Sequence, residues 1–281
     1  MKNQLSTFAL LGMLTGLVLA VGALVAPGHL ALFAALALAM NLGAYFFSHR
    51  IVLRMHHARE LGEDEAPRLH AIVAELAARA EIPKPRVFLM PDLQPNAFAT
   101  GRSPDHGVVA VTEGLLRLLD PRELRGVIAH ELAHIKNRDI LVSTLAASAA
   151  AIVTYVAQSL SWARLFGGTA QDDDESSSGG LLVALVAPLA ATLIQLGISR
   201  SREYLADETG ARIAGDAEAL AQALQKLEEA SAVVPSEATP AAASLFIVNP
   251  LGALDRLARW FSTHPSTEER VRRLRALREL T

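Results

Sequence analysis

The chain contains the stretch DPRELRGVIAHELAHIK at residues 120–136. Asp120 suits the N-cap of a helix, and Pro121 suits its first turn. Glu123 suits the third helical position, where its carboxylate can accept a hydrogen bond from the backbone N–H of the N-cap residue. Apolar residues then recur at helical spacing, with no glycine or proline between Val127 and Asp139. The sequence therefore predicts a helix that begins after Asp120 and carries the HELAH run.

Two histidines of this run, His130 and His134, are four residues apart. A helix turns about 100° per residue, so both imidazoles lie on one face and can reach one metal ion. Glu131 lies beside that face, where a carboxylate can take a proton from a metal-bound water. The alternative is an ordinary helix with two unrelated histidines, so the rest of the chain has to decide between these interpretations.

Composition limits the kind of protein and the kind of site. Of the 281 residues, 51% are hydrophobic, which is high for a soluble domain of this size. The net charge of −3 gives no indication of nucleic-acid binding. Because the chain has no cysteine, disulfides and thiolate metal sites are excluded, and a metal must be held by histidine and carboxylate.

Four uncharged apolar stretches are about long enough to cross a bilayer: residues 5–26, 30–47, 141–160 and 181–199. Pro27-Gly28-His29 joins the first two as a tight hairpin. A cleaved signal peptide followed by one anchor is the alternative for this pair, but the first stretch is longer than the hydrophobic region of a signal peptide, and a second span follows almost at once. The last two stretches are rich in alanine, and the alternative for them is a pair of buried helices packed on the polar domain.

Charged residues predict the orientation of these spans. Lys2 precedes the first span, and Arg50 and Arg54 follow the second. The segments expected outside are the short turn at residues 27–29 and the acidic, Ser/Gly-rich residues 171–180. Positive charge marks the cytoplasmic side, so we expect a multi-pass membrane protein with both termini and the HELAH helix in the cytoplasm.

The polar region between the second and third spans predicts an amphipathic helix at about residues 66–80. Short strands are predicted at residues 86–90, 96–101 and 107–112, just before the HELAH helix. The expected fold is α+β and mainly helical, with about four transmembrane helices and a small β-sheet. An extended peptide can pair with an exposed edge of such a sheet.

The predicted order of domains follows from these spans. Residues 1–48 form a transmembrane hairpin, residues 49–140 the first part of a cytoplasmic domain, residues 141–199 two further spans with an outside loop, and residues 200–281 the second part of the cytoplasmic domain.

A third metal ligand must come from another helix, because no further histidine follows His134 closely. The run SREYLAD at residues 201–207 places Glu203 and Asp207 four residues apart, on one side of a helix. One carboxylate can bind the metal while the other supports a ligand imidazole. Two imidazoles and a carboxylate favour zinc without excluding cobalt or manganese.

Four motifs in this order strongly resemble the M48 family of membrane metalloproteases. They are HELAH, SREYLAD, the NAFATG run at residues 96–101, and STHPSTEER at residues 262–270. The resemblance covers nearly the whole chain. It implies a gluzincin-like protease domain with one Zn²⁺ per chain, bound by His130, His134 and Glu203.

The resemblance also implies roles for further residues. Glu131 would be the general base, and Asp207 would orient a ligand imidazole. His264 would donate a hydrogen bond to the developing oxyanion, or would instead fix the turn before the last helix. Asp139 would support the zinc site or cap the third span. The strand candidates for binding substrate are Asn96, Ala97, Phe98 and Ala99.

The family resemblance implies hydrolysis of peptide bonds in polypeptides, with misfolded or damaged membrane proteins as substrates and the lipid bilayer as a partner. One alternative is a protease with a defined substrate, of the CAAX prenyl-protein type, for which this chain is short. Another is a zinc-stabilised membrane scaffold or chaperone without catalysis. The intact Glu131 argues against the scaffold, because a structural metal site needs no base.

Overall fold

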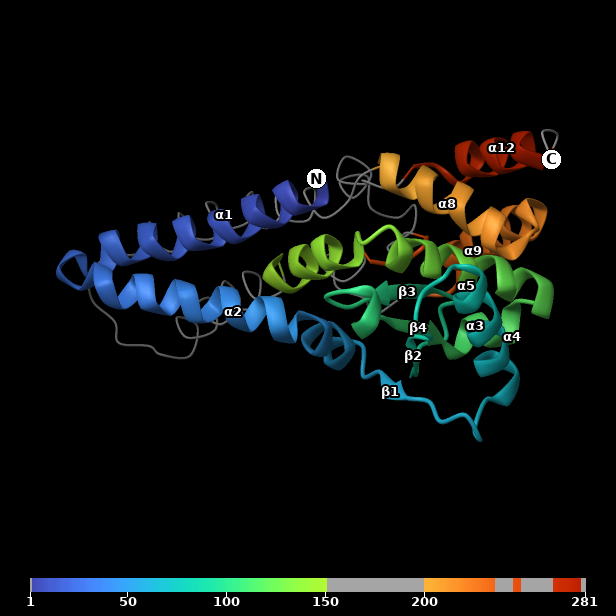
Figure 1. The fold of residues 1–281 in the computed structure, drawn as a ribbon, viewed down its shortest axis with the longest axis horizontal. Coiled ribbons are helices and arrows are strands. Elements are labelled where there is room, and N and C mark those ends of the chain that lie inside the picture. The colour runs from blue at the N-terminus through green and yellow to red at the C-terminus, as the bar shows by residue number, and fades with distance from the viewer. Residues whose placement is uncertain (1, 151–199, 236–244, 249–264, 279–281) are drawn as a thin grey trace.

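The computed structural model describes residues 2–150, 200–235, 245–248 and 265–278, and the protein is mainly helical with one small mixed sheet (Figure 1). Its elements are α1 (Lys2–Val25), η1 (Pro27–His29), α2 (Leu30–Met55), β1 (Arg59–Glu60), α3 (Pro67–Arg79), β2 (Arg86–Met90), β3 (Ala97–Thr100), η2 (Pro104–His106), β4 (Val108–Thr112), α4 (Glu113–Leu118), α5 (Pro121–Lys136), α8 (Arg200–Ala214), α9 (Ala217–Val233) and α12 (Thr267–Arg278). A further apolar helix, Ile140–Ala150, follows α5.

Helices α1 and α2 form a hairpin that projects from the sheet (Figure 1), and the apolar helix Ile140–Ala150 packs against it. The Asn41 amide donates a hydrogen bond of 2.7 Å to the hydroxyl of Thr15 and ties the two helices together. Large apolar side chains such as Leu32 face outward. Among the described residues, α2 is the one helix that is long and apolar enough to cross a membrane. It continues to Met55, beyond the predicted end of the second span.

The other two predicted spans are covered only in part. Residues 140–150 are helical, as predicted for the start of the third span, and residues 151–199, with the fourth span, lie outside the described residues. Both spans therefore stay predictions.

The sheet has the strand order β1-β2-β4-β3. Strands β2 and β4 are parallel, and β3 and β1 are antiparallel to their neighbours. The three predicted strands are confirmed within one residue at each end. Strand β1 was not predicted, because two residues are too short to show an alternating pattern. Strand β3 lies at one edge of the sheet, and this edge faces the site described below.

Both faces of the sheet are covered, so every residue of β4 is buried. Side chains including Val109 and Val111 belong to the core around α5. The side chains on the opposite face of the sheet, including those of Phe88 and Phe98, pack with Val52 near the end of α2. The apolar hairpin is thus joined to the sheet by a continuous core.

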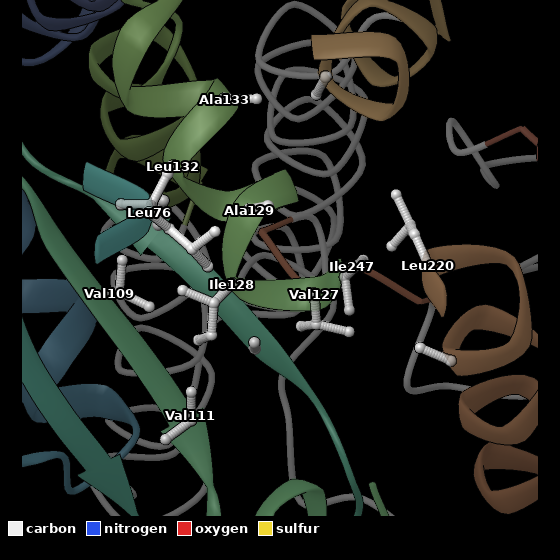
Figure 2. Packing of buried hydrophobic residues seen from close by; sticks show 14 of the residues in the cluster. Leu76, Val109, Val111, Val127, Ile128, Ala129, Leu132, Ala133, Leu220 and Ile247 are labelled. Atoms are coloured by element: carbon white, nitrogen blue, oxygen red, sulfur yellow. The ribbon is translucent and has the colours of Figure 1, made fainter. Parts of the chain in front are cut away.

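Helix α5 is the centre of the fold. Figure 2 shows its apolar side chains, including Ile128, between strand β4 and the part of α9 that carries Leu220. The predicted capping box is present: the Asp120 carboxylate accepts from the N–H of Glu123 at 2.9 Å, and the Glu123 carboxylate accepts from the N–H of Asp120 at 3.0 Å. Because such caps satisfy free N–H groups at the helix start, they fix where α5 begins.

Candidate metal centre

His130 and His134 lie on one face of α5, as their spacing predicts. Their Nε2 atoms are 3.1 Å apart. Two nitrogens that bind one tetrahedral zinc ion at about 2.0–2.1 Å are separated by roughly 3.3 Å. The two imidazoles therefore already have the separation that a shared zinc ion requires.

The third candidate ligand, Glu203, comes from α8. One carboxylate oxygen lies 3.8 Å from Nε2 of His130, and the other lies 3.8 Å from Nε2 of His134. The ligand atoms of the three residues all lie within 4.8 Å of one another. Ligand atoms on one zinc ion cannot be more than about 4.3 Å apart, and the separations of 3.1 and 3.8 Å between these nitrogens and oxygens are within that limit.

Gly210 explains how α8 approaches α5 so closely. A Cβ atom at this position would lie 2.8 Å from the Cα of His130, which is closer than real Cβ atoms come. The glycine therefore allows the backbones of α5 and α8 to touch. This contact lies two helical turns from Glu203 and sets how far its carboxylate is from the histidines.

Each ligand imidazole has a carboxylate behind it. The Nδ1 atom of His134 lies 3.1 Å from both oxygens of Asp139. The Nδ1 atom of His130 lies 3.0 Å from Asp207, although the direction of its N–H is not aligned for a normal hydrogen bond. A carboxylate near Nδ1 favours the tautomer in which Nε2 is free to bind metal.

Burial and charge shift the pKa values of these groups. Burial opposes the protonation of His134, but the carboxylates of Asp139, Glu203 and Glu131 outweigh burial and raise its pKa to about 10. Burial lowers the pKa of His130, against the opposite effect of Asp207. So much negative charge around two imidazoles favours a cation at this place, and zinc would compete there with the proton on His134.

Glu131 is buried beside the three candidate ligands, and burial raises the pKa of its carboxyl to about 7. The backbone N–H of Ala99, on the edge strand β3, donates to this carboxylate. Glu131 lines a cavity of about 20 Å³, together with His134, Glu203 and the segment 245–247. A volume of roughly 10–15 Å³ is enough for one water molecule, so a reacting water fits next to Glu131.

The segment 245–248 lies against the strand candidates for binding substrate. The N–H of Ile247 donates to the carbonyl of Ala97 at 3.1 Å. The amide of Asn96 donates to the carbonyl of Val248 at 2.8 Å. Phe98 points away from the metal centre, into the core shared with α2. Of the four strand candidates, Ala99 is the residue that lies in the cavity wall beside Glu131.

Arg270 is buried behind the site and binds Asp207, a role that is not predicted from the sequence. Only its place at the end of the STHPSTEER motif singled it out, because nothing in the sequence tells which carboxylate an arginine will meet. His264 lies outside the described residues, so its role stays a prediction.

Comparisons with known proteins agree with this geometry. Residues 63–278 match the model of peptidase family M48. The chain is 54% identical to a "Protease HtpX homolog" of Syntrophobacter fumaroxidans, over 99% of this chain and 100% of the relative. It is 52% identical to a "Protease HtpX homolog" of Pyrococcus furiosus, over 96% of this chain and 94% of the relative.

The fold is similar to a solved structure, the crystal structure of Ste24p from S. mikatae, with a TM-score of 0.50 and 19% identity. The similarity covers 97% of this chain and 64% of that protein, so this chain corresponds to less than two thirds of its length. The family model matches most of the chain, and the relatives are about half identical to it over nearly its full length. We conclude that this chain belongs to peptidase family M48.

Proposed function

We propose that this protein is a membrane-bound, zinc-dependent endopeptidase that hydrolyses peptide bonds with an activated water. The observation that carries the proposal is the cluster of His130, His134 and Glu203, with the Glu131 carboxylate buried in the wall of the same cavity. Membership of a peptidase family is the second support. A structural zinc site uses four protein ligands and needs no base, whereas three ligands leave one position for a reactant.

Zinc at this site would act as a Lewis acid, which acidifies water and polarises a carbonyl. Glu131 accepts a proton from the attacking water while the water oxygen bonds to the peptide carbon. As the carbon–nitrogen bond breaks, the same carboxyl returns the proton to the leaving amine. Burial favours the protonated form of the Glu131 carboxyl, which makes its carboxylate a stronger base than an exposed one.

Other residues support this reaction. Asp139 and Asp207 hold the imidazoles of His134 and His130 in place from behind. An extended substrate would lie beside strand β3, with its scissile bond near Ala99 and Glu131. We propose His264 as the donor to the developing oxyanion, on the strength of its place in the STHPSTEER motif.

The proposed setting is the bacterial inner membrane, with the metal centre and both termini on the cytoplasmic side. Its support is the apolar hairpin α1–α2, with Arg50 and Arg54 in the last turns of α2, next to the sheet. A site joined to a membrane hairpin fits polypeptide substrates that are themselves membrane proteins, and we propose quality control of damaged ones. A protease with one defined substrate is the alternative, and it would cleave few members of a panel of unfolded membrane proteins.

The deciding experiment compares the detergent-purified wild type with the Glu131→Gln variant for cleavage of a model membrane protein and for zinc content. We expect cleavage by the wild type only, with about one zinc in each protein, because Glu131 is a base and not a ligand. Glu113→Gln changes a partly exposed glutamate at the start of the neighbouring helix α4, and as the matched control it should retain activity. Zinc in every protein with cleavage by none would favour the non-catalytic scaffold.

A further inference from the structure

Arg270 is buried in the first turns of α12, with 1% of its surface exposed. Buried arginine is rare, and a fully desolvated guanidinium requires partners for its donors. Within the described part of the chain, the partners of Arg270 come from three separate segments, and each of them borders the metal centre. This arrangement indicates a specific task and not a surface ion pair.

The first partner is Asp207, the carboxylate behind His130. Arg270 binds it in the two-pronged geometry, with Nε donating to one oxygen at 2.9 Å and Nη2 donating to the other at 2.7 Å. Both oxygens are thereby fixed in place. Asp207 lies four residues after Glu203, so its carboxylate is also near the proposed metal position. The two hydrogen bonds from Arg270 keep that carboxylate beside the Nδ1 atom of His130.

The second partner is the segment 245–248. Nη1 of Arg270 donates to the carbonyl of Ile247 at 2.7 Å, and Ile247 in turn donates its N–H to Ala97 on the edge strand. The guanidinium of Arg270 therefore holds two groups in place: Asp207, which supports the candidate ligand His130, and Ile247, which lines the cavity.

The third neighbour is the metal-binding nitrogen itself. Nη2 of Arg270 lies 3.5 Å from Nε2 of His130. A positive charge at this distance disfavours a cation unless another charge balances it, and Asp207 supplies that balance. Arg270 must therefore act through Asp207 if it helps metal binding, because its own charge opposes it.

We propose that Arg270 is a positioning residue for the metal centre. It orients the carboxylate of Asp207 toward His130, and it holds Ile247 in the wall of the cavity. This inference rests on the proposed zinc site. Lysine cannot replace it fully, because an ammonium group lacks the planar fork that reaches both oxygens of Asp207 and a carbonyl together. Loss of such supporting residues typically lowers metal affinity about 10–100-fold.

The test is the zinc affinity of the metal-free, detergent-purified full chain, measured by competition with a chromophoric chelator. We expect Arg270→Gln to bind zinc about 10–100-fold more weakly and Arg270→Lys to recover only part of the loss. Arg272→Gln removes an exposed arginine of the same helix and should match the wild type. Full recovery with lysine, or an unchanged Arg270→Gln, would overturn the proposal.

A double-mutant comparison shows whether Arg270 acts through Asp207. We expect Asp207→Asn with Arg270→Gln to bind zinc no more weakly than Asp207→Asn alone. Both proteins of this comparison avoid an uncompensated buried charge, so it carries the test even if Arg270→Gln does not fold: the double variant has neither charge, and in Asp207→Asn the carboxylates of Glu203 and Glu131 remain near Arg270. A clear further loss in the double variant would contradict the proposal. A wild type that binds no zinc would instead contradict the proposed function.

Discussion

A Cβ atom at Gly210 would lie 2.8 Å from the Cα of His130, so this pair marks the point where α8 touches α5. The two helices supply the three candidate zinc ligands between them. Their separation therefore determines whether Glu203 could reach an ion placed between the two histidines.

Gly210→Ala should push α8 away from α5. We expect at least a tenfold loss of zinc affinity and a destabilisation of about 1–3 kcal/mol, because the added methyl group meets backbone that cannot rotate aside. Chelator competition and thermal unfolding measure the two effects. Gly43→Ala is the control, since a Cβ atom there finds no neighbour within 4 Å. Equal zinc affinity in both variants would show that the helix contact does not set the ligand distance.

Glu203→Ala should lose zinc together with activity, because two imidazoles alone leave the ion with too few protein ligands. The matched control is Glu208→Ala, which removes an exposed carboxylate of the same helix that is paired with Arg212. Metal analysis after dialysis gives the result. A Glu203→Ala protein that retains zinc and activity would move the third ligand to another residue, with Asp207 the first to examine.

Removal of zinc should lower the unfolding temperature of the wild type. Zinc at 100 times its dissociation constant stabilises the folded state by about 2.7 kcal/mol, and a chelator withdraws this contribution. Thermal unfolding with and without chelator should differ for the wild type but not for Glu203→Ala. A chelator effect of the same size in both proteins would place it outside this centre.

Asn96→Ala should loosen the segment 245–248 while leaving zinc in place. The Asn96 side chain holds both the carbonyl and the N–H of Val248, at 2.8 and 3.4 Å, and touches no candidate ligand. Hydrogen exchange should therefore quicken at Ile247 and Val248. Gln94→Ala is the control, because that amide holds Val234 instead. Slow exchange at Val248 in Asn96→Ala would mean that other contacts hold the segment.

The sequence predicted what depends on local pattern. Asp120, Pro121 and Glu123 marked the start of α5, and the spacing of His130 and His134 placed both on one face. Three strands were evident from short apolar runs between turn residues. The proximity of Glu203 to the histidines was predicted from its motif, and the structure brings the three together.

Contacts between distant parts of the chain could not be predicted in this way. Nothing local shows that the glycine at position 210 meets the backbone of His130, or that Arg270 reaches back to a carboxylate 63 residues earlier. The segment 245–248 has no helical or alternating pattern, so its position along β3 is visible only in the folded chain. These contacts are properties of packing, which residue order alone does not specify.

Arg270 follows His130, which it supports through Asp207, by 140 residues. A ribosome makes the chain from its N-terminus, so α5 and α8 both exist before α12 has been synthesised. A chain made only as far as α8 lacks Arg270, so by the proposal above it would bind zinc about 10–100-fold more weakly. The order of synthesis would then keep proteolysis low, while the first helices enter the membrane, until α12 has been made.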